Sequence, residues 1–264
     1  MHRTIAIVNQ KGGVGKSTTV VNLGASLALL GSRVLICDLD PQANATSGLG
    51  APKASASSSA YGVLIEGRRV SEVVVATDVA GLQLVPSSPH LAGAEIELVP
   101  IISRETRLRD ALQPAGESHD LILLDCPPSL GLLTINALTA ATEVLIPIQC
   151  EYYALEGLSQ LLDSVRLVQK FLNPSLDITG VLLTMYDART RLAEQVAAEV
   201  RRFFKEKMYD TVIPRSIRLA EAPSFGMPAV VFDPSSRGAE AYMDLAKEVV
   251  TRGRNAATFV GHVG

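Results

Sequence analysis

Short runs rich in Val, Ile and Leu recur along the chain, and several are apolar throughout instead of alternating with polar residues. Strands that are buried on both faces of a parallel sheet have this pattern. Helix-length amphipathic stretches separate most of the runs, for example residues 17–30, which close on Gly31, and residues 151–172, which end before Asn173-Pro174. The runs predict strands at residues 4–9, 33–38, 82–86, 120–125, 143–149, 178–184, 211–214 and 229–232.

Alternating strands and helices of this kind indicate an α/β fold. We expect a doubly wound, mostly parallel sheet of about seven or eight strands, with helices on both faces. The chain has 264 residues, of which 47% are hydrophobic and 19% charged, so a large core is available and global disorder is excluded. We predict a single domain over residues 1–252 and a flexible tail at residues 253–264, which lack periodicity.

The sequence also bears on the compartment. No stretch reaches about 18 uninterrupted apolar residues, and no secretion signal precedes the first strand-like run. Cys37, Cys126 and Cys150 are far apart and lie in or beside apolar runs, which is typical of reduced, buried thiols and not of disulfides or a zinc site. We therefore expect a soluble cytoplasmic protein that binds no membrane.

The overall charge excludes one class of function. The chain has 24 Lys and Arg and 27 Asp and Glu, a net charge of −3. Proteins that coat nucleic acid through bulk charge are strongly basic. The balance argues against such a protein, although it leaves room for a local basic surface.

A glycine-rich segment lies between the first predicted strand and the first predicted helix, and it reads Gln10-Lys11-Gly12-Gly13-Val14-Gly15-Lys16-Ser17-Thr18. Glycines in such a turn let several backbone N–H groups converge on phosphate oxygens, and the positive end of the following helix adds to the attraction. Lys16 is placed to bind the β- and γ-phosphates, and the Ser17 hydroxyl to bind Mg²⁺. The segment therefore predicts a phosphate site of the P-loop kind.

This segment departs from the common P-loop at its first position, five residues before Gly15, where Gln10 replaces glycine and Lys11 follows. A second lysine is not needed to hold one nucleotide, which suggests that Lys11 contacts a nucleotide bound to a neighbouring subunit. Two alternatives are a glycine-rich turn without a ligand and a dinucleotide site with Asp38 on a ribose. The order of strand, loop, Lys-Ser and helix argues against the first, and Lys16 at the helix start argues against the second.

Carboxylates follow two of the predicted strands, Asp38 and Asp40 after the second and Asp125 after the run at 121–124. The carboxyl ends of the strands form the edge at which open α/β sheets bind ligands. Alone, an Asp at the end of a strand is often a turn residue or a helix cap. Beside a P-loop it fits a Walker B position, in which a rigid support holds the carboxylate near Mg²⁺.

The motifs KGGVGKST with its leading lysine, DLDPQANATSGLG and LILLDCPPSLGLLTINAL resemble those of the ParA/Soj chromosome-partitioning ATPases, which carry a deviant Walker A motif. A wider superfamily with MinD and the nitrogenase iron proteins shares them. The tracts at 91–104 and 151–162, with RLAEAPSFGMP and RGAEAY, are similar to the short Soj type in particular. The similarity extends from about residue 3 to residue 250, and no helix-turn-helix region precedes the P-loop.

The resemblance implies roles for individual residues in an ATP-sandwich homodimer. Lys11 of each subunit would reach the phosphates bound by the other, and Asp40 would position the attacking water. The catalytic residues would be Lys11, Lys16 and Asp40, the Mg²⁺ residues Ser17, Asp38 and Asp125, and the ATP-binding residues 11–18 with Pro214 and Arg215 near the adenine. Hydrolysis would be slow until a ParB-type DNA-binding protein stimulates it, and the chain shows no Arg or Gln in an obvious hydrolysis-activating motif.

Residues 187–218 contain eight basic and five acidic residues, a net charge of +3 against −6 for the rest of the chain. We predict a helix from about Thr190, with Arg191, Arg202 and Lys205 on one face and Leu192, Val196, Val200 and Phe203 on the opposite face, toward the sheet. Solvation alone explains many charged helix faces. The resemblance favours contacts with double-stranded DNA, without sequence preference, through Arg189, Arg191, Arg202, Lys205 and Arg218.

The sequence thus predicts a nucleoid-associated DNA-partitioning ATPase that dimerises with ATP, binds DNA and is released on hydrolysis. A MinD-like membrane switch is an alternative, but it needs an amphipathic C-terminal anchor, and the tail offers only Phe259 and Val260 as a bulky apolar pair. An iron–sulfur carrier is another alternative. It needs paired ligand cysteines, and Cys126 and Cys150 are unpaired in the local sequence.

Overall fold

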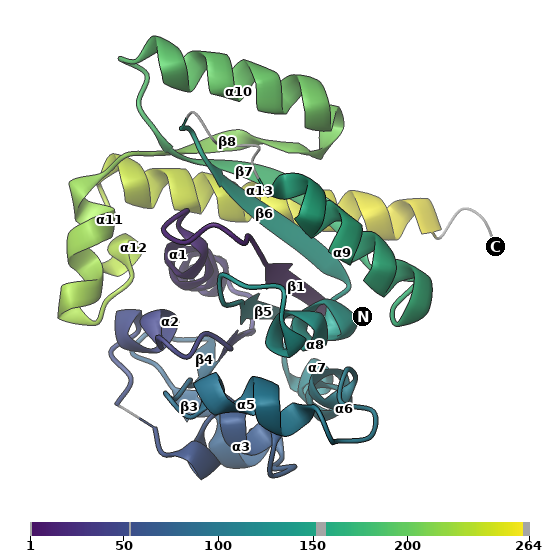
Figure 1. Ribbon diagram of the computed structural model, residues 1–264. Coiled ribbons are helices and arrows are strands. Elements are labelled where there is room, and N and C mark those ends of the chain that lie inside the picture. The colour runs from purple at the N-terminus through teal and green to yellow at the C-terminus, as the bar shows by residue number, and fades with distance from the viewer. Residues whose placement is uncertain (1, 53, 152–156, 261–264) are drawn as a thin grey trace.

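The computed structural model describes residues 2–52, 54–151 and 157–260 and is drawn in Figure 1. These residues form one eight-stranded sheet with the order β3-β4-β2-β5-β1-β6-β7-β8. Every pair of neighbouring strands is parallel except β3 and β4, which are antiparallel. The strands are β1 (Arg3–Ile7), β2 (Val34–Asp38), β3 (Val75–Ala76), β4 (Leu82–Val85), β5 (Leu121–Asp125), β6 (Glu143–Gln149), β7 (Asp177–Tyr186) and β8 (Met208–Pro214).

Helices connect the strands and cover both faces of the sheet (Figure 1). The α-helices are α1 (Lys16–Leu29), α2 (Asn44–Gly48), α3 (Ala60–Leu64), α4 (Val70–Val73), α5 (Leu91–Leu98), α6 (Arg107–Leu112), α7 (Ala115–Ser118), α8 (Leu132–Ala140), α9 (Leu158–Phe171), α10 (Arg191–Phe204), α11 (Ile217–Glu221), α12 (Ala229–Phe232) and α13 (Arg237–Val260). Short 3₁₀ turns are η1 (Ala56–Ser58), η2 (Lys205–Lys207) and η3 (Ala222–Phe225).

Two hydrophobic clusters make up the core, one on each face of the sheet. One is formed with α1, α2 and α11 to α13, and the other with α3 to α10. Strands between the two layers are apolar on both faces, and every residue of β2 and β5 is buried. This arrangement confirms the predicted doubly wound α/β fold.

The predicted strand at 229–232 is wrong, because these residues form the helix α12. Pro228 precedes it, and the Asn22 side chain accepts a hydrogen bond from the backbone N–H of Ala229 at 2.7 Å. Ala229 and Val230 are buried while Val231 is 44% exposed. A four-residue apolar run fits one helical turn as well as a strand, so the spacing of its apolar residues could not distinguish a helix from a strand. The eighth strand is instead β3, a two-residue edge strand that the sequence pattern does not reveal.

Two predicted boundaries differ from the structure. The helix predicted from residue 151 begins in the structure at Leu158, and residues 152–156 lie outside the described part of the chain. Helix α13 continues to Val260, through most of the segment predicted as a tail, and residues 261–264 are not described. The flexibility of residues 253–264 stays a prediction.

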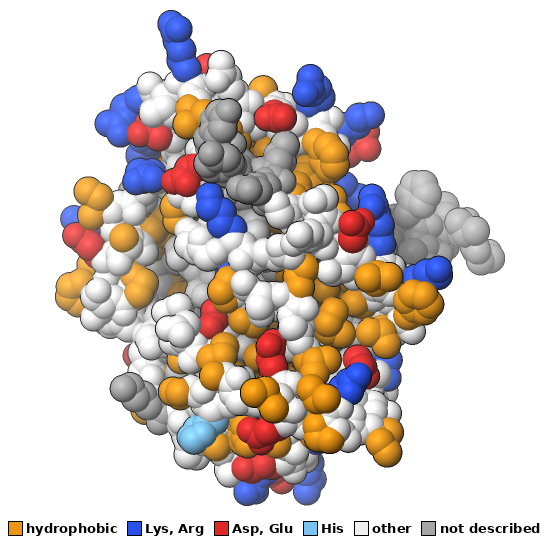
Figure 2. All heavy atoms as spheres, viewed as in Figure 1, with side chains coloured by type: hydrophobic (Ala, Val, Ile, Leu, Met, Phe, Trp, Pro, Cys, Tyr) orange, Lys and Arg blue, Asp and Glu red, His pale blue; other side chains and the backbone are white. Residues whose placement is uncertain are grey.

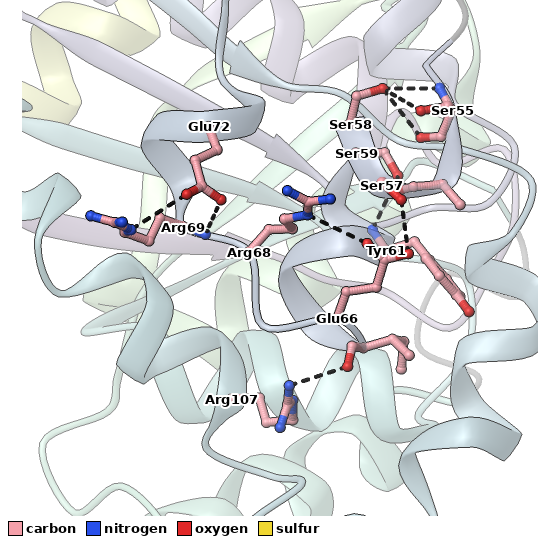
Figure 3. A network of polar contacts seen from close by, with 12 residues as sticks. Ser55, Ser57, Ser58, Ser59, Tyr61, Glu66, Arg68, Arg69, Glu72 and Arg107 are labelled. Atoms are coloured by element: carbon pink, nitrogen blue, oxygen red, sulfur yellow. Dashed lines mark hydrogen bonds and ion pairs between the residues drawn. The ribbon is translucent and has the colours of Figure 1, made fainter.

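A polar network ties the Ser-rich segment before α3 to its surroundings (Figure 3). Ser59 caps α3 by accepting a hydrogen bond from Tyr61 N, and Ser57 Oγ donates to Glu66 at 2.9 Å. The Arg107 guanidinium donates to the carbonyl of Leu64 at the end of the same helix. The contacts of Ser59 and Arg107 satisfy backbone groups that a five-residue helix leaves open at its ends.

Asn173, which follows α9, holds the end of α8. Its buried Nδ2 lies within hydrogen-bond distance of the carbonyls of Leu138, Thr139 and Ala141, at 3.1, 3.1 and 2.6 Å. We predict that Asn173→Ala lowers the free energy of unfolding by about 1–3 kcal/mol, because buried carbonyls lose their donor. Urea denaturation measures this. Ser164→Ala, on the partly exposed side of α9, is the control, with a change within about 0.5 kcal/mol. An equal loss of unfolding free energy in the two variants would contradict the role of Asn173 as the donor that holds the end of α8.

Candidate nucleotide-binding site

The glycine-rich segment forms the turn between β1 and α1, as predicted. Gly13 and Gly15 have φ of 76° and 90°, in the left-handed region that glycine adopts without strain. Gly15 is the N-cap of α1 and offers no side-chain cap, and the first turn of α1 contains no acidic residue. The N-terminal N–H groups of a 14-residue helix are therefore left open to an anion.

A cavity of about 390 Å³ opens beside this turn. A second cavity of about 230 Å³ adjoins it and shares Gly15, Thr18 and Met185 with the first. The first is lined by P-loop residues and by residues from the ends of the other strands, among them Gly12, Gly13, Lys16, Ser17, Asp40 and Pro128. The two together provide one polar and one more apolar compartment, which suits the phosphates and the base of a nucleotide.

Lys16 is the buried cation of the site, with 6% of its surface exposed. Its ammonium donates to the Lys11 carbonyl at 3.2 Å. Burial lowers the pKa of Lys16 below its ordinary value, and the nearby charges of Asp125 and Asp40 oppose the shift. A desolvated ammonium beside an open cavity favours a highly charged anionic ligand, because the ligand replaces the lost water.

Asp125, at the end of β5, is fully buried, and neither of its oxygens has a hydrogen-bond partner among the described residues. Burial raises the pKa of Asp125 well above its ordinary value, the charge of Asp38 adds to the rise, and the nearby Ser17 hydroxyl opposes it. Such orphaned acceptors fit a hard cation, since Mg²⁺ prefers oxygen ligands and takes few from the protein. Ser17 and Asp125 are thus suited to hold Mg²⁺ together with phosphate oxygens.

Asp38 lies beside Asp125 in the register of β2 and β5 but has its partners within the chain. Oδ1 accepts from the backbone N–H of Asp40 at 3.1 Å, and Oδ2 accepts from N and Oγ1 of Thr46 at 2.8 and 2.7 Å. Burial raises the pKa of Asp38 to about 6, although these hydrogen bonds lower it. The geometry favours Asp125 over Asp38 as the metal ligand, and Asp38, at 0% exposed, is too deeply buried to contact a ribose.

The predicted catalytic residue Asp40 lines the cavity and is 6% exposed. Its Oδ1 accepts from the backbone N–H of Gln42 at 2.9 Å, which fixes the carboxylate against its own loop. Lys11 points elsewhere in this single chain, with Nζ 3.4 Å from Glu151 Oε2. Both side chains of that pair are more than a third exposed, so the pair is weak and readily exchanged.

Pro214 and Arg215 line the second cavity, next to the P-loop, where the resemblance placed the adenine. The sequence missed Met185, which lines both cavities and has a φ of 51°, an uncommon value for a residue with a side chain. It also missed Thr184, whose Oγ1 donates to the carbonyl of Val14 in the P-loop at 2.8 Å. The one available signal was their place at the carboxyl end of β7, on the ligand-binding edge.

Helix α10 begins after Thr190, as predicted, and Thr190 caps it. Arg191 and Arg202 are exposed on the side opposite the buried residues Ala193, Val196, Ala197 and Val200. The prediction that Leu192 and Phe203 face the sheet is wrong, because they are 42% and 61% exposed. The small side chains of Ala193 and Ala197 let this face approach the sheet, which rotates the helix away from the larger residues. Figure 2 shows Lys and Arg side chains along the top edge, where α10 lies.

The other basic candidates are also at the surface. The prediction that Lys205 lies on the helix face is wrong, because α10 ends at Phe204 and Lys205, whose φ of 47° is not helical, is exposed in η2. The Arg189 side chain is 88% exposed and pairs with Asp187 at 2.7 Å, and the Arg218 side chain is 53% exposed and pairs with Glu221 and Asp233 at 2.9 and 3.1 Å. These ion pairs are exposed and therefore weak, so phosphates can replace the carboxylates.

The cysteines do not support an iron–sulfur site. All three are free and buried, and Cys126 is fully enclosed. Burial raises the pKa of Cys126 well above its ordinary value and that of Cys150 to about 11, so both thiols are held protonated. A cluster shared between subunits needs accessible thiolates.

The chain is similar in sequence to known proteins over nearly its whole length. A family model described as an AAA domain matches residues 2–178. The sporulation initiation inhibitor protein Soj of Bacillus subtilis is 61% identical over 253 residues, which cover 96% of this chain and 100% of that protein. The chromosome partitioning protein ParA of Myxococcus xanthus is 52% identical over 250 residues, covering 95% of this chain and 88% of that protein.

A solved structure shares the fold over nearly the whole chain. It is a cobyrinic acid a,c-diamide synthase from Mycobacterium smegmatis with a bound ATP analogue and magnesium. Its TM-score is 0.86 at 37% identity, and the alignment covers 97% of each chain. Within residues 2–52, 54–151 and 157–260, no helix is both long and apolar enough to cross a membrane.

Replacing Asp125 with Asn tests the orphaned carboxylate. Its folded-state pKa lies above the unfolded value, so the stability it contributes is present at acid pH and is lost as the pH rises past the ordinary carboxyl range near 4. Asp38, whose pKa is raised to about 6, likewise contributes stability that is lost as the pH rises from about 4 to about 6. We predict that the unfolding free energy of the nucleotide-free protein falls with pH in this window, and falls less in Asp125→Asn.

The same variant should lose most of the thermal stabilisation that Mg²⁺ adds in the presence of ATP, because a neutral amide replaces an anionic ligand. Asp120→Asn is the matched control, since Asp120 is an exposed carboxylate paired with Arg33. Differential scanning fluorimetry with and without Mg²⁺ makes the comparison. An equal Mg²⁺ effect in wild type and Asp125→Asn would remove Asp125 from the metal site.

Proposed function

The chain belongs to the ParA/Soj family of chromosome-partitioning ATPases, and we propose that it couples ATP hydrolysis to a cycle of dimerisation and DNA binding. A ParB-type protein would stimulate hydrolysis and thereby release the dimer from the nucleoid. The relatives named Soj and ParA, at 61% and 52% identity, favour this function over a MinD-like membrane switch.

One observation carries the ATPase part of the proposal. An uncapped helix N-terminus and a buried lysine line one cavity, and the buried carboxylate of Asp125, without a partner among the described residues, lies near that lysine. Each of these groups raises the free energy of the protein when the site is empty, because its charge or polar atoms lack partners. ATP with Mg²⁺ would supply partners for all three at once. The solved relative that binds an ATP analogue and magnesium supports this ligand.

The residues divide the chemistry among them. Backbone N–H groups of the P-loop and Lys16 bind the phosphates and stabilise the charge that develops on transfer. Asp40 orients the attacking water. Ser17 and Asp125 hold Mg²⁺, which when bound neutralises phosphate charge. Pro214 and Arg215 line the second cavity, where the base would bind.

The surface around the site supports a dimer. Lys11 is held by an exposed pair with Glu151, so it is available to the phosphates of a second subunit. Helix α5 and the residues after it expose Ile96, Val99 and Ile102, and hydrophobic side chains gather over α5 and α8 in Figure 2. Exposed apolar clusters of this kind mark interaction surfaces.

The basic surface formed by Arg189, Arg191, Arg202, Lys205 and Arg218 supports DNA binding. A few phosphate contacts for each subunit give weak, salt-dependent binding, and a dimer doubles them. Dimerisation by ATP thus controls affinity for DNA without a change within the surface itself. The rest of the chain has a net charge of −6, which keeps it from binding DNA on its own.

Removing two of the five basic side chains tests this surface. We predict that Arg189→Ala with Arg218→Ala weakens ATP-dependent binding to a non-specific duplex. The magnitude of the slope of log K against log salt should fall by about 0.9 for each phosphate that the variant no longer neutralises. Fluorescence anisotropy at several salt concentrations, with ATP, ADP and no nucleotide, measures both the affinity and the slope.

The matched control is Arg33→Ala with Arg166→Ala. These arginines are similarly exposed and ion-paired, with Asp120 and Asp163, but lie outside residues 187–218. The control removes the same charge and should leave the slope unchanged. DNA binding that is independent of ATP, or equal slopes of log K against log salt in the two double variants, would contradict the proposal.

Replacing Asp40 with Ala tests the catalytic assignment. We predict that Asp40→Ala binds ATP, hydrolyses it at least about a hundredfold more slowly and accumulates as a dimer, because the water is no longer oriented. Size-exclusion chromatography with light scattering and a phosphate-release assay are the measurements. Hydrolysis at the wild-type rate would exclude Asp40 from the mechanism.

A further inference from the structure

Asp40 belongs to a closed ring of hydrogen bonds that one distant residue completes. The backbone N–H of Asp40 donates to Asp38, and Asp38 accepts from Thr46 through its other oxygen. Thr46 Oγ1 in turn accepts from the backbone N–H of Ser87 at 2.9 Å, and Ser87 Oγ donates to the Asp40 carbonyl at 2.6 Å. The ring therefore returns to the residue from which it started.

All four members of the ring are buried. Their exposed fractions are 0% for Asp38, 6% for Asp40, 3% for Thr46 and 1% for Ser87. Water cannot replace a broken bond easily at such a site, and hydrogen bonds in a low-dielectric environment hold their geometry more strictly. The ring is thus a rigid support for the backbone of Asp40.

Ser87 differs from the other members by its origin. Asp38, Asp40 and Thr46 come from one short stretch, whereas Ser87 follows β4, the strand that pairs with β2 in register from Val34–Leu82 to Cys37–Val85. Its hydroxyl thus fixes the Asp40 loop relative to a second strand of the sheet. Without this hydroxyl, the loop keeps its bonds to β2 and α2 and the bond from Leu39 N to the Asp125 carbonyl at 2.9 Å, but the Asp40 carbonyl loses its side-chain donor from beside β4.

Ser87 is itself well anchored. The next residue, Ser88, is also 1% exposed, and its hydroxyl accepts from Ser59 Oγ at 3.2 Å. Ser59 caps α3 within the network of Figure 3, and the carbonyl of Pro86 accepts from the N–H of Ala60 at 2.9 Å. The support behind Asp40 therefore extends into the polar network around α3.

We propose that Ser87 is a positioning residue for ATP hydrolysis, which acts by holding the Asp40 backbone so that its carboxylate faces the phosphate cavity. The proposal rests on the proposed function, since it needs Asp40 to act on water. Small displacements of a group that orients a reactant cost large factors in rate while leaving binding intact. Ser87 does not line the cavity, so its loss should spare affinity for ATP.

The test compares Ser87→Ala with Ser88→Ala in single-turnover hydrolysis of ATP. Both variants remove one buried hydroxyl from adjacent residues, but only Ser87 contacts Asp40. We expect the hydrolysis rate of Ser87→Ala to fall at least about tenfold with an unchanged Kd for ATP, and that of Ser88→Ala to stay within about twofold of wild type. The rates are compared at temperatures equally far below the melting temperature of each variant. Equal rates in the two variants under these conditions would overturn the proposal.

A double-mutant cycle separates positioning from a general effect on the fold. If Ser87 acts through Asp40, Ser87→Ala has no further effect on the residual rate of Asp40→Ala. Additive losses would overturn the proposal. Wild-type activity in Asp40→Ala would instead refute the proposed catalytic role of Asp40.

Thr46→Val covers the case in which Ser87→Ala does not fold. It removes the hydroxyl that accepts from Ser87 N, keeps the side-chain shape and leaves the backbone bond from Thr46 to Asp38 in place. We expect the same lowered rate and unchanged Kd as for Ser87→Ala. A wild-type rate in Thr46→Val would overturn the proposal.

Discussion

Two carboxylates removed from water stand side by side at the ends of β2 and β5, and the organisation of the site depends on how each is compensated. Asp38 accepts three hydrogen bonds from its own loop, whereas Asp125 accepts none among the described residues. A buried charge without a partner costs several kcal/mol. One carboxylate therefore holds the loop of Asp40, and the other is left without a partner among the described residues.

The same logic applies to the positive groups of the site. Lys16 is buried and the N-terminus of α1 has no side-chain cap, so neither is satisfied fully within the chain. The strands β1, β2 and β5 carry both signs of charge to one edge of the sheet, since parallel strands end together. The buried layers on both faces keep that edge rigid, and a nucleotide with Mg²⁺ completes it.

The groups with proposed roles in assembly are held differently. Lys11, Arg189 and Arg218 form exposed ion pairs with Glu151, Asp187 and Glu221. Such pairs contribute about 0–1 kcal/mol and exchange readily for other anions. A buried, rigid centre with a weakly held rim is well suited to a switch, because partners can engage and leave without disturbing the catalytic geometry.

The sequence by itself determined the fold class, seven of the eight strands, the P-loop and the cluster of Asp38, Asp40 and Asp125, because periodicity and short motifs depend on neighbours along the chain. It could not decide that residues 229–232 are a helix, or that Ala193 and Ala197 instead of Leu192 and Phe203 face the sheet. Only the tertiary structure decided which carboxylate stays open and that Ser87 supports Asp40 from 47 residues away. Hydrogen-bond partners and packing depth depend on how strands lie next to one another in space, and a local pattern carries no record of that.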